Sequence, residues 1–356
     1  MTLTAAARSF ATRLGLEVPL IQAPMAGVQG TAMATAVSGA GALGSLPGAA
    51  MTPQALRDAV GEMRRAGGLP VNLNFFCHVA PTADPAREAA WREALRPYYE
   101  ELGLAFSAIS NGPGRLPFGD EAAAAVEDLR PEVVSFHFGL PPAPLLARVR
   151  RAGAQVWACA TTVAEAQWLA AHGVDAIIAQ GLEAGGHRGV FLPEGAAFDL
   201  GSQLRTLPLL TAILQAVRVP VIAAGGIVDA DGVADALRMG ASAAQVGTAF
   251  LLCTEATTSA VHRAALQGQA ARDTALTNLF TGRPARGIVN RLMRELGAIS
   301  ALAPAFPSAV NAIAPLRTAA EQAGRGDFSP LWSGTDTSGC RAIPAAQLVE
   351  QLVAKL

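Results

Sequence analysis

The stretch "VPVIAAGGIVDADGVADALRMGASAAQVGTAFLL", residues 219–252, decides the fold. An apolar, β-branched run ends at Gly225 and Gly226, an alanine-rich segment with helical periodicity follows, and a second apolar run ends at Gly247 and Thr248. A strand, a helix and another strand in this order predict two parallel strands joined by a helix.

The same alternation extends over most of the chain. Short apolar runs closed by glycine, proline or a small polar residue occupy residues 18–25, 40–46, 69–76, 132–140, 154–160, 176–184, 219–227 and 242–252. Helix-period segments separate them. Eight strand and helix units predict an α/β protein whose parallel sheet closes into a (β/α)8 TIM barrel.

Two parts of the sequence exceed what a barrel needs. We expect residues 1–76 and 131–253 to form the barrel and residues 77–130 to be an insertion at its mouth. Residues 254–330 should form a mainly helical cap or substrate domain, and residues 331–356 should return to the barrel. Barrel sites lie at the C-terminal ends of the strands, so both additions are placed to cover the site.

The composition narrows the functional class. Of the 356 residues, 51% are hydrophobic and 15% are charged, which is enough apolar material for a large buried core. The formal net charge is -1, so the sequence shows no overall electrostatic attraction to nucleic acid or to an anionic membrane. The four cysteines form no CxxC pair, so we expect neither a metal site nor a disulfide framework. The sequence shows no signal-peptide core and no membrane span, and we expect a cytoplasmic protein.

Lysine usage excludes two mechanisms. Lys355 is the only lysine in the chain. Schiff-base aldolases need an interior lysine as a nucleophile, and Walker A nucleotide-binding folds need one as a phosphate ligand. Neither mechanism is available to this sequence.

The glycines that close the last two strands suggest a phosphate site. Gly225, Gly226 and Gly247 let backbone N–H groups approach a phosphate closely, and Thr248 adds a hydroxyl. The phosphate could belong to a substrate or to a cofactor. At the ends of the first and third runs, Met25 offers an apolar surface, and the Asn74 amide suits the edge of a flavin or purine.

A histidine in side-chain-poor surroundings is the leading catalytic candidate. In "AQGLEAGGHRG", residues 179–189, His187 follows a glycine pair at the mouth of the predicted barrel. The glycines allow the backbone to lie flat against a bound ring system, so the imidazole can stand over that ring as a base or hydrogen-bond donor. Glu183 could orient His187 or face solvent. His137 could point into the mouth or pack in the wall.

These motifs together resemble the class I nitronate monooxygenases, formerly called 2-nitropropane dioxygenases. The resemblance rests on "PLIQAPMAG", "NLNFFCH", "VVSFHFGLP", "AQGLEAGGHRG", "VIAAGGI", "QVGTAFLLC", "LTNLFTGRPARGIVNR" and "LWSG". The pair "FGLP" and "QGxEAGGHRG" is specific. The glycine motifs alone would also fit flavin-dependent enoyl reductases.

The resemblance implies FMN in the glycine cradle and His187 as the catalytic residue. The implied flavin-binding residues are Ala23, Pro24, Met25, Asn74, Gln180, Gly185, Gly226, Gln245, Gly247 and Thr248. It further implies oxidation of alkyl nitronates, typically propionate 3-nitronate, by O2 through one-electron transfer and a flavin semiquinone, without a nicotinamide. His187 would be a base or an anchor for the anion.

The cap departs from the family pattern, in which tyrosines and a lysine line the substrate pocket. This chain has only Tyr98 and Tyr99, and its corresponding segments place His262, Phe306, Val310 and Ala314 there. A larger or less anionic substrate is one consequence, and His262 is a second candidate acid or base. The predicted substrate residues are His137, His262 and Phe306. Arg283 and Arg286 could pair with a carboxylate of the substrate or of the protein.

Three other functions remain open from the sequence. An NAD(P)H-dependent flavin reductase of enoyl thioesters or quinones would use the same cradle. An idle flavin-binding or partner-binding protein would keep the cradle without a working substrate pocket. A flavin-free isomerase would use the cradle for its own substrate. The oligomeric state is not indicated.

Overall fold

A closed parallel barrel is the main body of the protein. The computed structural model describes residues 2–110, 112, 114–192, 201 and 203–356. The barrel strands are β1 (Leu20–Gln22), β2 (Gly44–Leu46), β3 (Val71–Phe76), β4 (Val133–His137), β5 (Gln155–Ala160), β6 (Ala176–Gln180), β8 (Val221–Ala224) and β9 (Ala243–Val246). They pair in the order β1-β9-β8-β6-β5-β4-β3-β2, and a parallel bridge between Ile21 and Leu43 joins the two ends. The predicted TIM barrel is confirmed.

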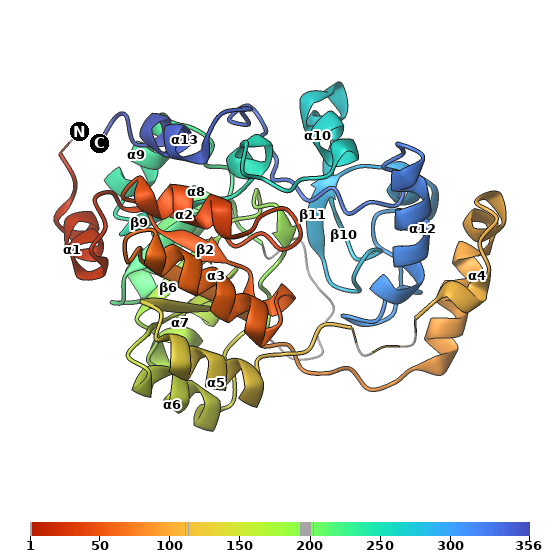
Figure 1. Ribbon diagram of the computed structural model, residues 1–356, viewed down its shortest axis with the longest axis horizontal. Coiled ribbons are helices and arrows are strands. Elements are labelled where there is room, and N and C mark those ends of the chain that lie inside the picture. The colour runs from red at the N-terminus through yellow and green to blue at the C-terminus, as the bar shows by residue number, and fades with distance from the viewer. Residues whose placement is uncertain (1, 111, 113, 193–200, 202) are drawn as a thin grey trace.

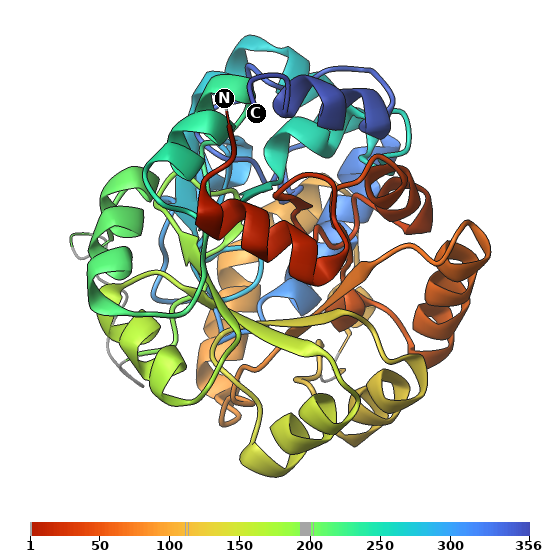
Figure 2. The same ribbon diagram turned by 90° about the vertical axis from the view of Figure 1, so that its left-hand side faces the viewer.

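Helices surround the barrel on the outside, as Figure 2 shows. They are α2 (Thr31–Gly39), α3 (Pro53–Arg65), α5 (Asp120–Leu129), α6 (Ala143–Arg151), α7 (Val163–Ala171), α8 (Thr206–Ala216), α9 (Ala230–Arg238) and α13 (Ala345–Leu352). The first helix, α1 (Ala5–Leu14), lies across one end of the barrel (Figure 2), where the Phe10 and Trp157 rings are 5.3 Å apart.

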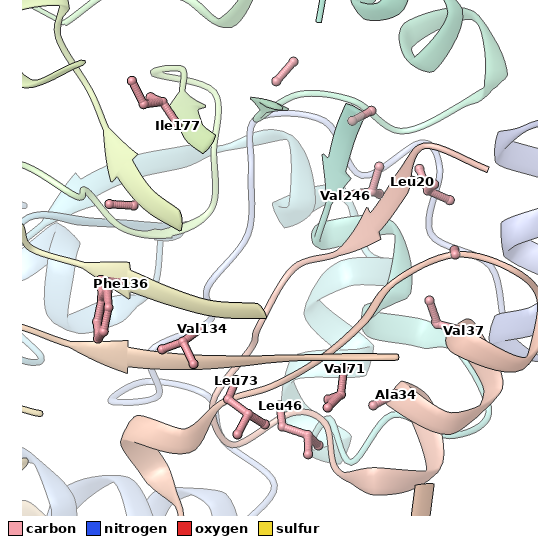
Figure 3. Packing of buried hydrophobic residues seen from close by; sticks show 14 of the residues in the cluster. Leu20, Ala34, Val37, Leu46, Val71, Leu73, Val134, Phe136, Ile177 and Val246 are labelled. Carbon is pink, nitrogen blue, oxygen red and sulfur yellow. The ribbon is translucent and has the colours of Figure 1, made fainter. Parts of the chain in front are cut away.

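The strands read as continuous apolar runs because both of their faces are buried. In β8, Val221 and Ala223 belong to the cluster that packs against the helices, whereas Ile222 and Ala224 belong to a second cluster inside the barrel. Figure 3 shows the outer cluster, with Leu73 of β3 beside Leu46 of β2. Parallel strands covered on both faces lose the polar alternation of half-exposed strands.

The insertion and the cap share a core of their own, apart from the barrel (Figure 1). Helix α4 (Pro85–Glu101) packs against α12 (Val310–Gln322), and the Tyr99 hydroxyl donates to the Ala312 carbonyl at 2.7 Å. The cap also contains α10 (Ala260–Gln267) and α11 (Arg291–Leu296). Helix α5, inside the 77–130 segment, instead packs with α3 and α6 in the barrel ring.

A small antiparallel sheet was not anticipated in the cap. Strands β10 (Thr274–Thr277) and β11 (Ala285–Ile288) pair with each other, and β11 also pairs with β7 (Gly186–His187) in the loop after β6. This sheet ties the cap to the barrel mouth. The division into domains stays a prediction. Within the described residues, no helix combines the length and apolar character needed to span a bilayer.

The close contact of α2 with β2 gives a stability test at Gly44. A Cβ added there would lie 2.2 Å from the Ala34 carbonyl oxygen, so Gly44→Ala must push the helix away from the strand. We expect the unfolding free energy to fall by about 2–3 kcal/mol. Gly39→Ala, at the end of the same helix, meets nothing within 4 Å and serves as the control. Urea unfolding measures both, and equal stabilities of the two variants would contradict this packing.

Candidate active site

A cavity of about 380 Å³ lies between the C-terminal ends of the barrel strands and the cap. All of the residues predicted for the flavin line it: Ala23, Pro24, Met25, Asn74, Gln180, Gly185, Gly226, Gln245, Gly247 and Thr248. His187, His137, His262 and Phe306 line it as well. The structure therefore brings together side chains from segments up to three hundred residues apart, while their individual roles remain predictions.

Backbone hydrogen bonds hold His187 at the cavity. The His187 carbonyl accepts from Gln180 Nε2 at 2.9 Å and from His137 Nε2 at 3.2 Å, while Gln180 Oε1 accepts from the Gly189 N–H at 2.9 Å. His187 is also paired with Ala285 of β11. The loop after β6 is thus fastened to the barrel on one side and to the cap on the other.

The neighbouring Arg188 strengthens this attachment. Its side chain is 1% exposed, and its guanidinium donates to the carbonyl oxygens of Gln180 (2.9 Å) and Gly181 (2.5 Å). It also donates to Gln203 Oε1. Burial lowers the pKa of Arg188 to about 10, so it stays charged at neutral pH. Arg188 therefore holds the start of the loop in place through these hydrogen bonds.

The His187 ring lies among aromatic side chains. Its centroid is 5.4 Å from Phe306, 5.7 Å from Trp332, 5.8 Å from Phe138 and 6.0 Å from Phe76. Its Nε2 shares a 2.9 Å hydrogen bond with the Thr281 hydroxyl. Burial, followed by the positive charge of Arg115, holds the pKa of His187 well below its usual range. The imidazole is therefore neutral at physiological pH.

Two further histidines at the cavity are also neutral. Burial lowers the pKa of His137 to about 4, and its Nε2 is engaged with the His187 carbonyl. Burial likewise lowers the pKa of His262 to about 4, despite a hydrogen bond to the Trp332 backbone. Within the described part of the chain, His262 Nε2 is buried without a hydrogen-bond partner. His137 is thus a support for the loop, whereas His262 has a free polar atom.

The glycine cradle has the backbone geometry that its sequence suggests. Gly225 and Gly226 have φ of +115° and +67°, a region that favours glycine, and a Cβ on Gly226 would lie 3.0 Å from Glu183 Cβ. Ala224 pairs with Gln245, so the β8 and β9 ends are adjacent. Outside helices and strands, the hydrogen bonds among the described residues use neither glycine's N–H. These donors are available to an anion.

The C-terminal segment covers this cradle. The Gly334 N–H donates to the Thr248 hydroxyl at 2.9 Å, and the Thr335 N–H donates to the Glu183 carbonyl at 3.0 Å. A Cβ on Gly185 would lie 2.6 Å from the Gly334 nitrogen, so glycine is required where the two segments touch. The motif "LWSG" therefore closes the site and brings Trp332 next to His187.

Polar groups for a ring edge come from two strands. Gln245 Oε1 is buried and, within the described residues, has no hydrogen-bond partner. Asn74 Nδ2 donates to the Ser135 hydroxyl at 2.9 Å. The other end of the same side-chain amide, Asn74 Oδ1, is therefore the group available to the cavity. Gln180 lines the cavity, both ends of its amide bind the loop, and its role at the flavin stays a prediction.

Glu183 does not orient His187. Its carboxylate pairs with Arg205 at 2.8 Å and accepts from the Thr206 N–H and hydroxyl. Burial alone would raise the pKa of Glu183, but these partners outweigh it and lower the pKa. Arg286 donates to the Leu182 and Thr274 carbonyls. Arg283 donates to the Val190 carbonyl and stacks over Phe138, so neither arginine pairs with a carboxylate within the described residues.

Several lining residues were not singled out from the sequence. Among them are Phe76, Arg115, Thr281 and Trp332. Trp332 and Arg115 lie in the motifs "LWSG" and "NGPGRLPFGD", but neither motif signals a cavity on its own. Among the residues that the structure describes, no group of histidine, cysteine or acidic side chains could hold a metal ion.

Comparison with known proteins identifies the family. Residues 8–355 match the sequence profile of the nitronate monooxygenase family. The chain belongs to this family. It is 41% identical to the nitronate monooxygenase of Pseudomonas aeruginosa, with 98% of each chain covered, and 43% identical to that of Paraburkholderia phytofirmans, with 98% and 95% covered. This protein is therefore an enzyme of a flavin-dependent oxidoreductase family.

The solved structures agree with this assignment. A nitroalkane oxidase from Streptomyces ansochromogenes superposes with a TM-score of 0.88 at 38% identity, over 98% of this chain and 97% of that one. FabK from Thermotoga maritima superposes with a TM-score of 0.68 at 24% identity, over 99% and 96%. The second likeness shows a shared fold alone.

The buried neutral histidines make stability depend on pH. As the pH falls from 6.5 toward 4, the unfolded chain protonates His262 before the folded chain does, because the folded pKa is lowered to about 4. The unfolding free energy should therefore fall, with His262 contributing up to about 1.4 kcal/mol per pH unit. His262→Gln should remove that part of the slope. Urea unfolding near pH 7, 6 and 5 tests this, and identical slopes in both proteins would refute it.

Proposed function

We propose that this enzyme binds FMN and oxidises alkyl nitronates, of the propionate 3-nitronate type, with O2. The observation that carries the proposal is a neutral, half-buried His187 held among aromatic rings beside a glycine-lined cradle at the barrel mouth. The names of the two bacterial relatives and of the Streptomyces nitroalkane oxidase support the same chemistry.

The residues of the cavity fit FMN. Gly225 and Gly226 present free backbone donors suited to the phosphate, next to Gly247 and Thr248 on the adjacent strand end. The unpartnered Gln245 Oε1 can accept a hydrogen bond from a ring N–H, and a buried acceptor without a partner is costly unless a ligand supplies one. When bound, FMN would supply the redox chemistry by taking electrons from the substrate carbon and delivering them to O2.

His187 can serve either form of the substrate. A nitroalkane must lose the proton on its reacting carbon, and a neutral imidazole can accept that proton. A nitronate has already lost it, so the imidazole then only needs to donate a hydrogen bond to the anion. In both cases the Thr281 contact and the loop attachment fix the ring, and the surrounding phenylalanines exclude water. Whether electrons leave the substrate one at a time remains a prediction.

Anaerobic mixing tests the reaction class. The purified protein should release FMN on denaturation, and propionate 3-nitronate should change the visible flavin spectrum without O2, whereas NADH in a parallel cell should not. Bleaching by NADH but not by the nitronate would favour an NAD(P)H-dependent flavin reductase. A flavin that responds to neither would mean that the protein binds flavin without this activity.

The role of His187 is tested by His187→Asn. The variant keeps a hydrogen-bonding side chain but loses the imidazole, and the backbone contacts that position the loop remain. We expect the FMN content to be unchanged and kcat/KM to fall by more than about 100-fold, as for loss of a general base. If turnover persists with the nitroalkane as substrate, His187 is not the base. If the variant loses turnover of the nitroalkane but keeps turnover of the nitronate, His187 acts as a base and not as an anchor for the anion.

A further inference from the structure

One arginine of the insertion is directed to the cavity by its own loop. Arg115 lines the cavity, and its carbonyl accepts from His78 Nε2 at 3.1 Å. Close by, the Phe118 N–H donates to the Phe76 carbonyl at 2.7 Å. A Cβ on Gly114 would lie 2.8 Å from Pro307, so the loop also touches the cap. Arg115 therefore has a defined position between barrel and cap.

Arg115 is a cation without a protein partner. Within the described residues, its guanidinium makes no hydrogen bond and no ion pair, and it lies over the Phe76 ring at 5.5 Å. The other arginines around the site all have partners: Arg188, Arg283, Arg286 and Arg317. Arg115 is half-buried, and burial lowers its pKa with no neighbouring acid to oppose that shift. Such a group is stabilised when an anion binds.

Basic groups surround His187 within the part of the chain that the structure describes. The charges that lower its pKa, after burial, come from Arg115, His137, Arg283 and His78, all of them basic groups. Arg115 and His187 both border Phe76, at 5.5 Å and 6.0 Å from its ring centroid. Phe76 therefore lies beside both the guanidinium and the imidazole, and all three side chains line the same cavity.

We propose that Arg115 binds a carboxylate at the end of the substrate remote from the reacting carbon, and so makes this enzyme selective for short carboxylated nitronates. This inference rests on the proposed function. A planar guanidinium matches a carboxylate with two parallel N–H donors, and that of Arg115 lies over the Phe76 ring at 5.5 Å. Arg115 is thus a specificity-determining residue, while His187 acts at the reacting carbon.

The cap helix α12 does not offer a comparable group. Helix α12 contributes Val310, Ile313 and Ala314, which are apolar. Its Arg317 also lines the cavity, but Glu321 holds it at 2.8 Å and its side chain is 44% exposed. A carboxylate there would compete with Glu321 and with water. The insertion loop, and not the cap helix, therefore supplies the positive charge that binds the substrate carboxylate.

Kinetics with two nitronates of matched length test the proposal. Propionate 3-nitronate carries the remote carboxylate, and propyl-1-nitronate lacks it. We expect Arg115→Met to raise KM for the first by about 10- to 100-fold with little change in kcat, and to leave the KM for the second within about threefold. Arg115→Lys should restore part of the selectivity. Equal effects on both substrates, or a larger effect of Arg317→Met, would overturn the proposal.

Binding without turnover provides a second readout. Succinate has the length of propionate 3-nitronate with a carboxylate in place of the nitronate, and butyrate lacks one of the charges. Calorimetric titration of the flavin-loaded protein should show tighter binding of succinate than of butyrate. Arg115→Met should abolish this difference in affinity. Equal succinate affinity in both proteins would refute the role of Arg115. If wild type oxidises neither nitronate, the proposed function fails, and the titration still decides whether Arg115 binds the anion.

Discussion

The geometry of the site depends on the loop after β6, which two side chains hold in place. Gln180 uses both ends of its amide on this loop, at the His187 carbonyl and the Gly189 N–H. Arg188 donates to carbonyl oxygens at the start of the same loop from a fully buried position. Because buried polar groups must find partners, these contacts leave the loop few alternative conformations. The position of the His187 imidazole is fixed as a result, because His187 belongs to this loop.

The low polarity around His187 sets the protonation state of the site. Phenylalanines and Trp332 surround the ring, and neighbouring charges are basic, so a proton on His187 would be unfavourable. This arrangement keeps the histidines neutral, because an added proton would meet neighbouring positive charge. It also favours a negatively charged ligand. The same physical constraint therefore disfavours protonated histidines and favours anionic substrates.

The cavity exists only because three distant parts of the chain meet over the barrel. The insertion contributes α4 to the core of the cap, the cap contributes the β10 and β11 pair that reaches β7, and the C-terminal segment crosses the glycine cradle. None of these parts could form the site alone. The barrel provides the strand ends, and the additional segments enclose the space above them.

Local pattern was sufficient for the barrel and for placing His187 and the glycines at its mouth. Apolar runs bounded by glycine identify buried parallel strands, and the C-terminal ends of those strands meet at one end of any such barrel. Residues grouped by this rule, such as Asn74, Gln180, Gly226 and Thr248, do line one cavity.

Tertiary structure decided what each side chain binds. Gln180 turned to the loop and Glu183 to Arg205, although both were plausible partners for ligand or histidine by spacing. Thr281 and Arg115 reach the cavity from segments with no periodic pattern, and the pairing of β7 with β11 joins residues about a hundred positions apart. Spacing in the sequence predicts which side chains lie close together only when both belong to the same helix or strand. Contacts between elements depend on packing of the whole chain, which is why the positions of Arg115 and Thr281 at the cavity emerged only from the structure.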